Sequence, residues 1–168
     1  FLKPLNNTLL SLVETHKSPS SIWIDFKEIT KMRLAISVVF SSMAGYLLGA
    51  YTIDWATIVM LAVGGYLMVG ASNAYNQILE KDLDALMDRT KNRPVPSGRM
   101  SVRTAFVIAC VFTILGLVTL YYINPITAVF GGISIFLYVC VYTPLKTKTP
   151  LSVFVGAFPG AIPFMMGL

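Results

Sequence analysis

The chain has 168 residues, of which 55% are hydrophobic and only 12% are charged, and its formal net charge is +5. A soluble domain would carry about twice that share of charged residues, so this composition, with a mean hydropathy of +0.70, is typical of a membrane protein. The positive charges cluster between long apolar runs, so no nucleic-acid partner is expected. The two cysteines, Cys110 and Cys140, lie inside apolar runs without metal-ligand spacing, which argues against a disulfide framework or a zinc site.

Residues 1–33 are predicted to form a cytoplasmic or interfacial segment. Ser18 and Pro19 are typical of a helix start. After them, apolar residues recur at helical spacing and charged residues are expected on the opposite side. The apolar set is Ile22, Trp23, Phe26 and Ile29, and the charged set is Asp25, Lys27 and Glu28. This pattern predicts an amphipathic helix lying in the membrane interface.

Five long apolar runs follow, and each is predicted to be a transmembrane helix: 34–53, 56–79, 104–123, 126–143 and 151–168. A helix needs about 20 residues to span the hydrocarbon core, and the last run, of roughly 18, lies near the lower limit. Short turns at Asp54 and at Asn124 make successive helices antiparallel. The expected fold class is therefore all-α, a polytopic transmembrane helix bundle forming a single membrane domain over residues 1–168.

All 13 Lys and Arg residues fall on one side of this membrane map. They lie in residues 1–33, in a polar loop at residues 80–103, and in a short basic loop at residues 144–150. The positive-inside rule places these segments on the cytoplasmic side, or on the matrix side in an organelle. The expected location is a bacterial inner membrane or the mitochondrial inner membrane, with the 80–103 loop, the predicted catalytic loop, on that side.

Four polar residues recur at intervals of four where the second apolar run ends: Asn76, Glu80, Asp84 and Asp88. Each step of four drifts by about 40° around a helix, so the four side chains would cover one broad face. Like charges at this spacing repel one another, and acids at membrane depth are costly. A divalent cation would relieve both problems, and magnesium suits best because it combines carboxylate oxygens with substrate phosphates.

A basic cluster follows the acids, with Arg89, Lys91, Arg93 and Arg99 as candidates to hold diphosphate oxygens. Arginine binds such groups bidentately. Together with magnesium, these cations would stabilise a departing pyrophosphate. The spacing leaves a plainer alternative open, a solvated helix end whose acids pair with nearby Lys and Arg.

These residues resemble the first aspartate-rich motif of the UbiA superfamily of intramembrane prenyltransferases, NxxxDxxxD followed by RTxxRPxxxG. The matching positions are Asn76, Glu80, Asp84, Arg89, Thr90, Arg93, Pro94 and Gly98. Within the superfamily, the middle Glu80 and the run at residues 80–87 are similar to the branch that farnesylates haem. Residues 30–33, 142–146 and 156–163 also resemble that branch, although Met32 and Thr147 stand where it usually has Pro and often has Arg.

The resemblance implies a fold of roughly nine membrane-spanning helices, each of about 20 residues. It also places a second acidic motif near the sixth and seventh helices, so we expect this chain to be the N-terminal part of such a fold. Asn76, Glu80 and Asp84 would bind a magnesium ion bridging the diphosphate. Asp88, Arg89, Arg93 and Lys146 would support or contact that diphosphate.

The reaction that the resemblance implies joins the farnesyl group of farnesyl diphosphate to a vinyl group of haem B, with Mg²⁺ as cofactor, giving haem O and pyrophosphate. The lipid bilayer is the third partner, and a haem A synthase or a terminal oxidase under assembly is a possible fourth. Two alternatives stay open. One is a prenyltransferase for a quinone precursor or another aromatic acceptor, and the other is a non-enzymatic transporter or membrane subunit whose acids line a polar cavity.

Overall fold

The computed structural model describes residues 19–146, 149 and 161–162. Every regular element among them is helical, and four helices are long and apolar enough to cross a membrane: Met32–Gly49, Trp55–Leu79, Val102–Ile123 and Pro125–Leu145. The expected all-α, multi-pass fold class is therefore confirmed. The fifth predicted helix, at residues 151–168, falls outside the described residues except for residues 161–162.

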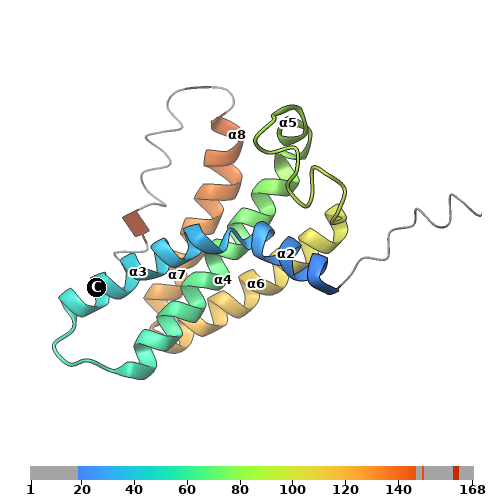
Figure 1. The fold of residues 1–168 in the computed structure, drawn as a ribbon. Helices are drawn as coiled ribbons and strands as arrows, with labels where there is room; N and C mark the ends of the chain where they lie inside the picture. The colour runs from blue at the N-terminus through green and yellow to red at the C-terminus, as the bar shows by residue number, and fades with distance from the viewer. Residues whose placement is uncertain (1–18, 147–148, 150–160, 163–168) are drawn as a thin grey trace, which may run out of the picture.

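Figure 1 shows the bundle, with helix α4 (Trp55–Leu79) at its centre and helices α3 (Met32–Gly49), α6 (Val102–Ile123) and α7 (Pro125–Phe136) around it. The fourth crossing continues from α7 through a π-helical stretch, η1 (Leu137–Tyr142), into the short α8 (Thr143–Leu145). Helix α5 (Lys81–Leu86) and α8 lie at the same end of the bundle. This arrangement brings the end of α4 and the end of the fourth crossing together.

Polar caps begin three of the crossing helices where the sequence turns. Asp54 accepts hydrogen bonds from the backbone of Ala56 (3.2 Å) and Thr57 (3.0 Å) at the start of α4. Asn124 accepts from Ile126 (2.9 Å) at the start of α7, where Pro125 takes the first helical position. Ser101 caps α6 in the same way. Such side chains satisfy backbone donors that the first helical turn leaves unpaired, so these helices begin where the caps dictate.

Glycines bring α4 and α6 close together. A Cβ built on Gly70 of α4 would lie 2.9 Å from a ring carbon of Phe112, and one on Gly116 of α6 would lie 2.8 Å from the sulfur of Met68. Small residues of this kind allow membrane helices to pack backbone against side chain. The outward faces of α3, α6 and α7 stay apolar and exposed, as a bilayer requires.

We expect Gly70→Ala to weaken the α4–α6 contact by about 1–3 kcal/mol, because the added methyl group meets the ring of Phe112 and forces it to move. The matched control is Gly132→Ala in α7, where a Cβ would meet Leu117 at an ordinary 3.7 Å. Thermal unfolding in detergent should show a lower midpoint for Gly70→Ala and an unchanged or higher one for Gly132→Ala. Equal midpoints for the two variants would contradict this packing.

Helix α2 (Pro19–Thr30) forms where the amphipathic helix is expected, but the predicted division of its residues between two faces is partly wrong. Asp25 is buried, on the same side as Ile29, while Ile22 and Trp23 are exposed. Residues four apart share a helix face, so Asp25 and Ile29 turn inward together. The buried carboxylate is compensated by an ion pair with Arg99, which also holds Glu28 at 2.6 Å.

The polar loop at residues 80–103 is more ordered than its composition predicts. It contains α5, and the residues after α5 fold back so that Val95 and Met100 are buried in one cluster with Ile29, and Pro94 is also buried. Backbone hydrogen bonds close the turns, including Met100 N to Pro94 O at 2.8 Å. Gly98 adopts a φ of 75°, which glycine tolerates without a steric penalty. The segment is thus a packed cap on the end of the bundle.

Candidate functional site

The polar residues that recur at intervals of four begin near the end of α4 and continue into and beyond α5. Asn76 belongs to the last turns of α4, Glu80 forms the junction between the two helices, and Asp84 lies in α5. All three side chains are buried, with exposed fractions of 2%, 7% and 4%. Asp88 lies beyond α5, and its side chain, 97% exposed, pairs with Lys91 at 2.6 Å. The structure therefore gathers three of the four predicted residues at one site and places Asp88 and Lys91 apart from it.

Glu80 is held by the end of the fourth crossing. Lys146 Nζ donates to Glu80 Oε2 at 2.7 Å, and Asn76 Nδ2 donates to the same oxygen at 3.0 Å. Lys146 and Thr143 both donate to Asn76 Oδ1, at 3.4 and 3.3 Å. A buried carboxylate and a lysine 66 residues away thus form one network, and hydrogen bonds to charged groups are the stronger ones.

Asp84 is held by the loop that follows it. Arg93 Nη1 donates to Asp84 Oδ2 at 2.7 Å, and only a quarter of the Arg93 side chain is exposed. Thr90, which is buried, donates its hydroxyl to the backbone oxygen of Asp84 at 2.9 Å, and the backbone of Arg93 donates to Thr90 O at 3.0 Å. The turn from Thr90 to Arg93 therefore aims the guanidinium at the acid.

Lys31 is a further member of the site, and the sequence analysis did not select it. It stands between α2 and α3 with a left-handed backbone, φ 47° and ψ 57°. Burial, followed by the positive charges of Arg93 and Lys146, lowers the pKa of Lys31 below 10.5, while Asp84 and Glu80 act in the opposite direction. The Lys31 ammonium is therefore within electrostatic range of both ion pairs. The available signal was a lysine three residues before the first apolar run, at the same membrane boundary as the acids.

The site carries more positive than negative charge. Two buried carboxylates, Glu80 and Asp84, lie among three cationic side chains, those of Lys31, Arg93 and Lys146. Partial burial strengthens the field of the remaining positive charge because water screens it less. A cluster of this composition favours an anionic ligand.

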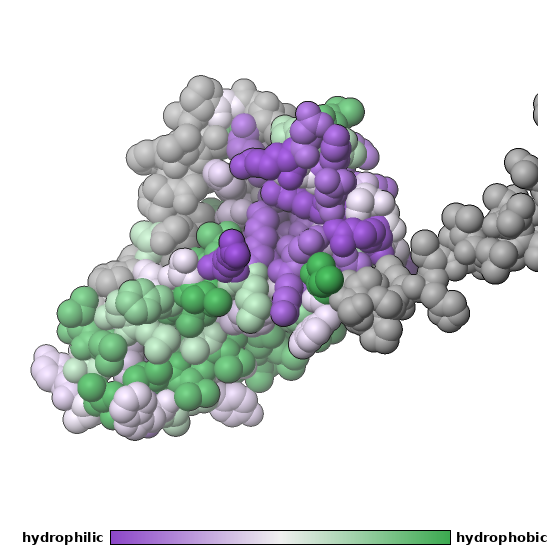
Figure 2. All heavy atoms as spheres, viewed as in Figure 1, coloured by the Kyte–Doolittle hydropathy of each residue, from purple (hydrophilic) through white to green (hydrophobic). Residues whose placement is uncertain are grey.

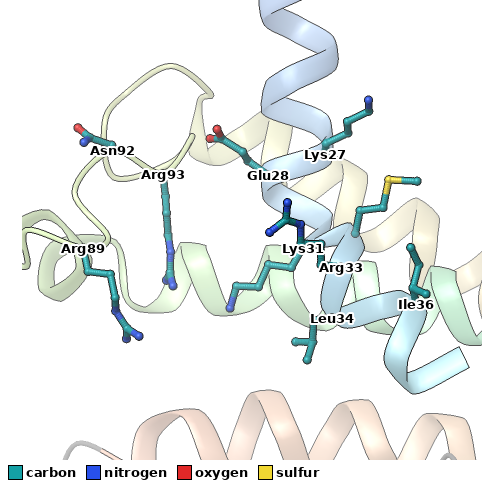
Figure 3. Close-up of a pocket in the computed structure, with 10 residues that line it drawn as sticks. Lys27, Glu28, Lys31, Arg33, Leu34, Ile36, Arg89, Asn92 and Arg93 are labelled. Carbon is teal, nitrogen blue, oxygen red and sulfur yellow. The ribbon is translucent and has the colours of Figure 1, made fainter. Parts of the chain in front are cut away.

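A cleft of about 750 Å³ opens beside this cluster. Its lining residues come from α2, the α2–α3 junction, α3 and the loop after α5: Lys27, Glu28, Lys31, Met32, Arg33, Leu34, Ile36, Arg89, Asn92 and Arg93. Figure 3 shows Lys31, Arg89 and Arg93 extending in the same direction from two separate segments. Figure 2 shows hydrophilic residues gathered at this end of the molecule and hydrophobic residues covering the other. The cleft thus lies at the boundary between the polar and apolar parts of the surface.

The donors at the site suit magnesium that arrives with its own phosphate ligands. Among the described residues, no group of three His, Cys, Asp or Glu side chains is arranged to hold a metal ion. Glu80, Asp84 and the amide oxygen of Asn76 offer oxygen donors only. Mg²⁺ is commonly bound through one or two carboxylates, with substrate phosphates and water filling the other positions. The residues present fit that mode of binding.

Fold and site together define an all-α, multi-pass membrane protein with a buried polar site at one end of the bundle. The model of the UbiA prenyltransferase family matches residues 38–168, and the chain belongs to that family. The resemblance noted from the motifs is thereby confirmed.

Among curated relatives, the chain is 75% identical over 158 residues to the protoheme IX farnesyltransferase of Christiangramia forsetii. That match covers 94% of this chain and 53% of the relative, so the chain spans about half the length of the relative.

Two solved structures share the fold. A digeranylgeranylglyceryl phosphate synthase aligns with a TM-score of 0.80 at 20% identity, covering 86% of this chain and 52% of that one. A UbiA homologue from Archaeoglobus fulgidus, bound to DMAPP and Mg²⁺, aligns with a TM-score of 0.77 at 19% identity, covering 86% and 53%. At these identities the likeness shows the fold alone.

Proposed function

We propose that the protein is a magnesium-dependent prenyltransferase that moves the farnesyl group of farnesyl diphosphate to a vinyl group of haem B. The products are haem O and pyrophosphate. The observation that carries this proposal is the pair of buried carboxylates, Glu80 and Asp84, set among three cations at the end of an apolar bundle. The name of the Christiangramia relative supports the choice of donor and acceptor.

In this proposal, one set of polar residues binds the diphosphate through Mg²⁺ and a second set binds it directly. Asn76, Glu80 and Asp84 would hold Mg²⁺, which neutralises charge on the leaving group when it is bound. Lys31, Arg93 and Lys146 would donate to the phosphate oxygens, with Arg93 bidentate. Contacts of Arg89 and Lys91 with the diphosphate, and any supporting role of Asp88, stay predictions. Within the part of the chain that the structure describes, no ion pair joins these three residues to the cluster, and Lys91 and Asp88 pair with each other.

The reaction breaks the bond between the first farnesyl carbon and the diphosphate oxygen, and the electron pair leaves with pyrophosphate. The terminal vinyl carbon of haem B then attacks the allylic cation, and water adds to the carbon beside the ring, releasing one proton. The cations of the site stabilise the negative charge that develops on the leaving oxygen. The apolar helices would hold the isoprenoid away from water until the acceptor attacks.

The proposal also fixes an orientation. The site lies with the basic segments, and the positive-inside rule supports the proposal that it faces the cytoplasm or the matrix. The membrane, a bacterial or mitochondrial inner membrane, stays a prediction. A haem A synthase or a terminal oxidase as the recipient of the product stays a prediction.

The test is mass spectrometry of haem after incubating the full-length membrane protein with haem B, farnesyl diphosphate and magnesium. We expect a hydroxyethylfarnesyl derivative of haem, and its loss when EDTA removes magnesium. A farnesylated quinone precursor in place of that product would favour the other acceptor class. No transfer to any acceptor would favour a transporter or subunit and reject the proposal.

Lys31 gives the reaction a predicted alkaline limit. Above its lowered pKa, Lys31 loses the proton and the positive charge that binds diphosphate, so kcat/KM for farnesyl diphosphate should fall as pH rises. Lys31→Arg keeps the charge, because the guanidinium pKa is about 12.5 or above. The falling limb of the pH profile should therefore move to higher pH in Lys31→Arg. An unchanged limb would show that another group sets it.

A further inference from the structure

The cleft beside the acidic site holds cations that the diphosphate cluster does not use. Arg33, on α3, and Arg89, after α5, both line the cleft and are exposed. Within the described part of the chain, neither forms an ion pair with a carboxylate. The single acid in the lining, Glu28, is already paired with Arg99. The cleft therefore contains positive charge that no carboxylate in its lining neutralises, and this charge could bind a second anionic group.

The other wall of the cleft is apolar. Met32, Leu34 and Ile36 line it from the first turns of α3, and all three side chains are exposed. These residues belong to a membrane-spanning helix, whereas Arg89 and Arg93 belong to the loop. Figure 3 shows the side chains of both segments around the same space. A ligand suited to both walls has an extended apolar body and anionic groups at one edge.

We propose that this cleft is the acceptor site, and that Arg33 and Arg89 bind the carboxylates of a macrocyclic acceptor whose ring rests on the apolar wall of α3. The inference rests on the proposed function and names the part of the site that selects the acceptor. Haem B has this chemistry, a flat apolar ring with two propionates at one edge. The volume of about 750 Å³ falls within the range of about 300–1,000 Å³ usual for small-molecule sites.

The donor is the other possible source of an anionic group for these arginines. Its diphosphate is served by Lys31, Arg93 and Lys146, which lie at the buried carboxylates. Lys31 and Arg93 also line the cleft, so the diphosphate would lie at its inner end, beside the buried carboxylates. Arg33 and Arg89, which are exposed and form no ion pair with a carboxylate among the described residues, are then left for a carboxylate of the acceptor.

The test compares haem B with its dimethyl ester, in which both propionates are neutral, as acceptors for the full-length protein at saturating farnesyl diphosphate and magnesium. The wild-type protein should show an apparent KM about tenfold lower for haem B than for the ester, because a charge-assisted hydrogen bond contributes about a factor of ten or more. Arg33→Met and Arg89→Met should each raise the KM for haem B towards that of the ester. The KM for farnesyl diphosphate should not change, and for Arg89 this result would favour the acceptor over the diphosphate contact predicted from the sequence.

The matched control is Arg103→Met, which removes an exposed arginine at the start of α6 that does not line the cleft. It should leave both KM values unchanged. Equal use of haem B and its ester by the wild-type protein would overturn the inference while the proposed function stands. A rise in the KM for farnesyl diphosphate in Arg33→Met and Arg89→Met would assign the arginines to the donor and also overturn it. No farnesylated product from either haem would instead reject the proposed function.

Discussion

Asp84→Asn in the full-length protein should lower kcat by about 10²–10³-fold, the effect expected when one electrostatic contact to the leaving group is removed. Asparagine keeps the size of the side chain and still accepts a hydrogen bond from Arg93, which lies 2.7 Å from the carboxylate. It lacks the negative charge that a magnesium ion would need. The measurement is single-turnover formation of farnesylated haem at saturating substrates.

The structure supplies a matched control two residues away. Asp82 lies in the first turn of α5 and is exposed, and Asp82→Asn makes the same chemical change outside the cluster. It should retain activity within about twofold, since exposed charges away from a site have small effects. Both variants must insert and elute as the wild type does in detergent. Near wild-type turnover by Asp84→Asn would remove the metal site from the proposal.

Asp88→Asn tests whether Asp88, which the sequence groups with Asp84 by its spacing, belongs to the site. A continuous helix would place Asp88 on the same face as Asp84, and loss of activity would support its predicted role. In the structure the helix is interrupted at Glu80 and ends at Leu86, and Asp88 turns to solvent beside Lys91. A small effect would show that Asp88 does not belong to the site. The end of the helix before Asp88, which the four-residue spacing does not reveal, would be the reason.

The features that the sequence could predict are those encoded locally. The hydropathy of a helix and its cap depend only on residues within that helix or directly before it. Asp54 and Asn124, for example, were selected as turns and act as caps. The place of Asn76, Glu80 and Asp84 at the polar end of an apolar run was also readable from the sequence. Such signals need no knowledge of which helix packs against which.

The features that it could not predict depend on contacts between distant segments. Asp25 is buried because Arg99, 74 residues later, provides its ion pair, and no helical period contains that partner. Lys31 has a left-handed backbone conformation between two helices, and it lies near charges from a loop and from the fourth crossing. Helix α5, with 6 residues, is too short for its apolar period to be distinguished from a loop.

Arg93→Ala should raise the apparent KM for farnesyl diphosphate by about 10–150-fold, the loss expected for one charge-assisted contact of about 1.5–3 kcal/mol. Arg93 is the cation that the turn at Thr90 directs at Asp84, so its removal takes a proposed phosphate donor from the site. The effect on kcat should be smaller than for Asp84→Asn, because the proposed metal ligands remain. Initial rates over a range of farnesyl diphosphate concentrations separate the two parameters.

Two further variants distinguish binding from folding. Removing Arg93 leaves the buried Asp84 without its ion pair, which destabilises a fold as well as a site. Arg93→Lys keeps the charge but not the bidentate geometry, so its KM should lie between those of the wild type and Arg93→Ala. The double variant Asp84→Asn with Arg93→Ala removes the unpaired acid and should recover thermal stability but not activity. An unchanged KM in Arg93→Ala, with the protein folded, would show that the guanidinium positions the acid rather than the substrate.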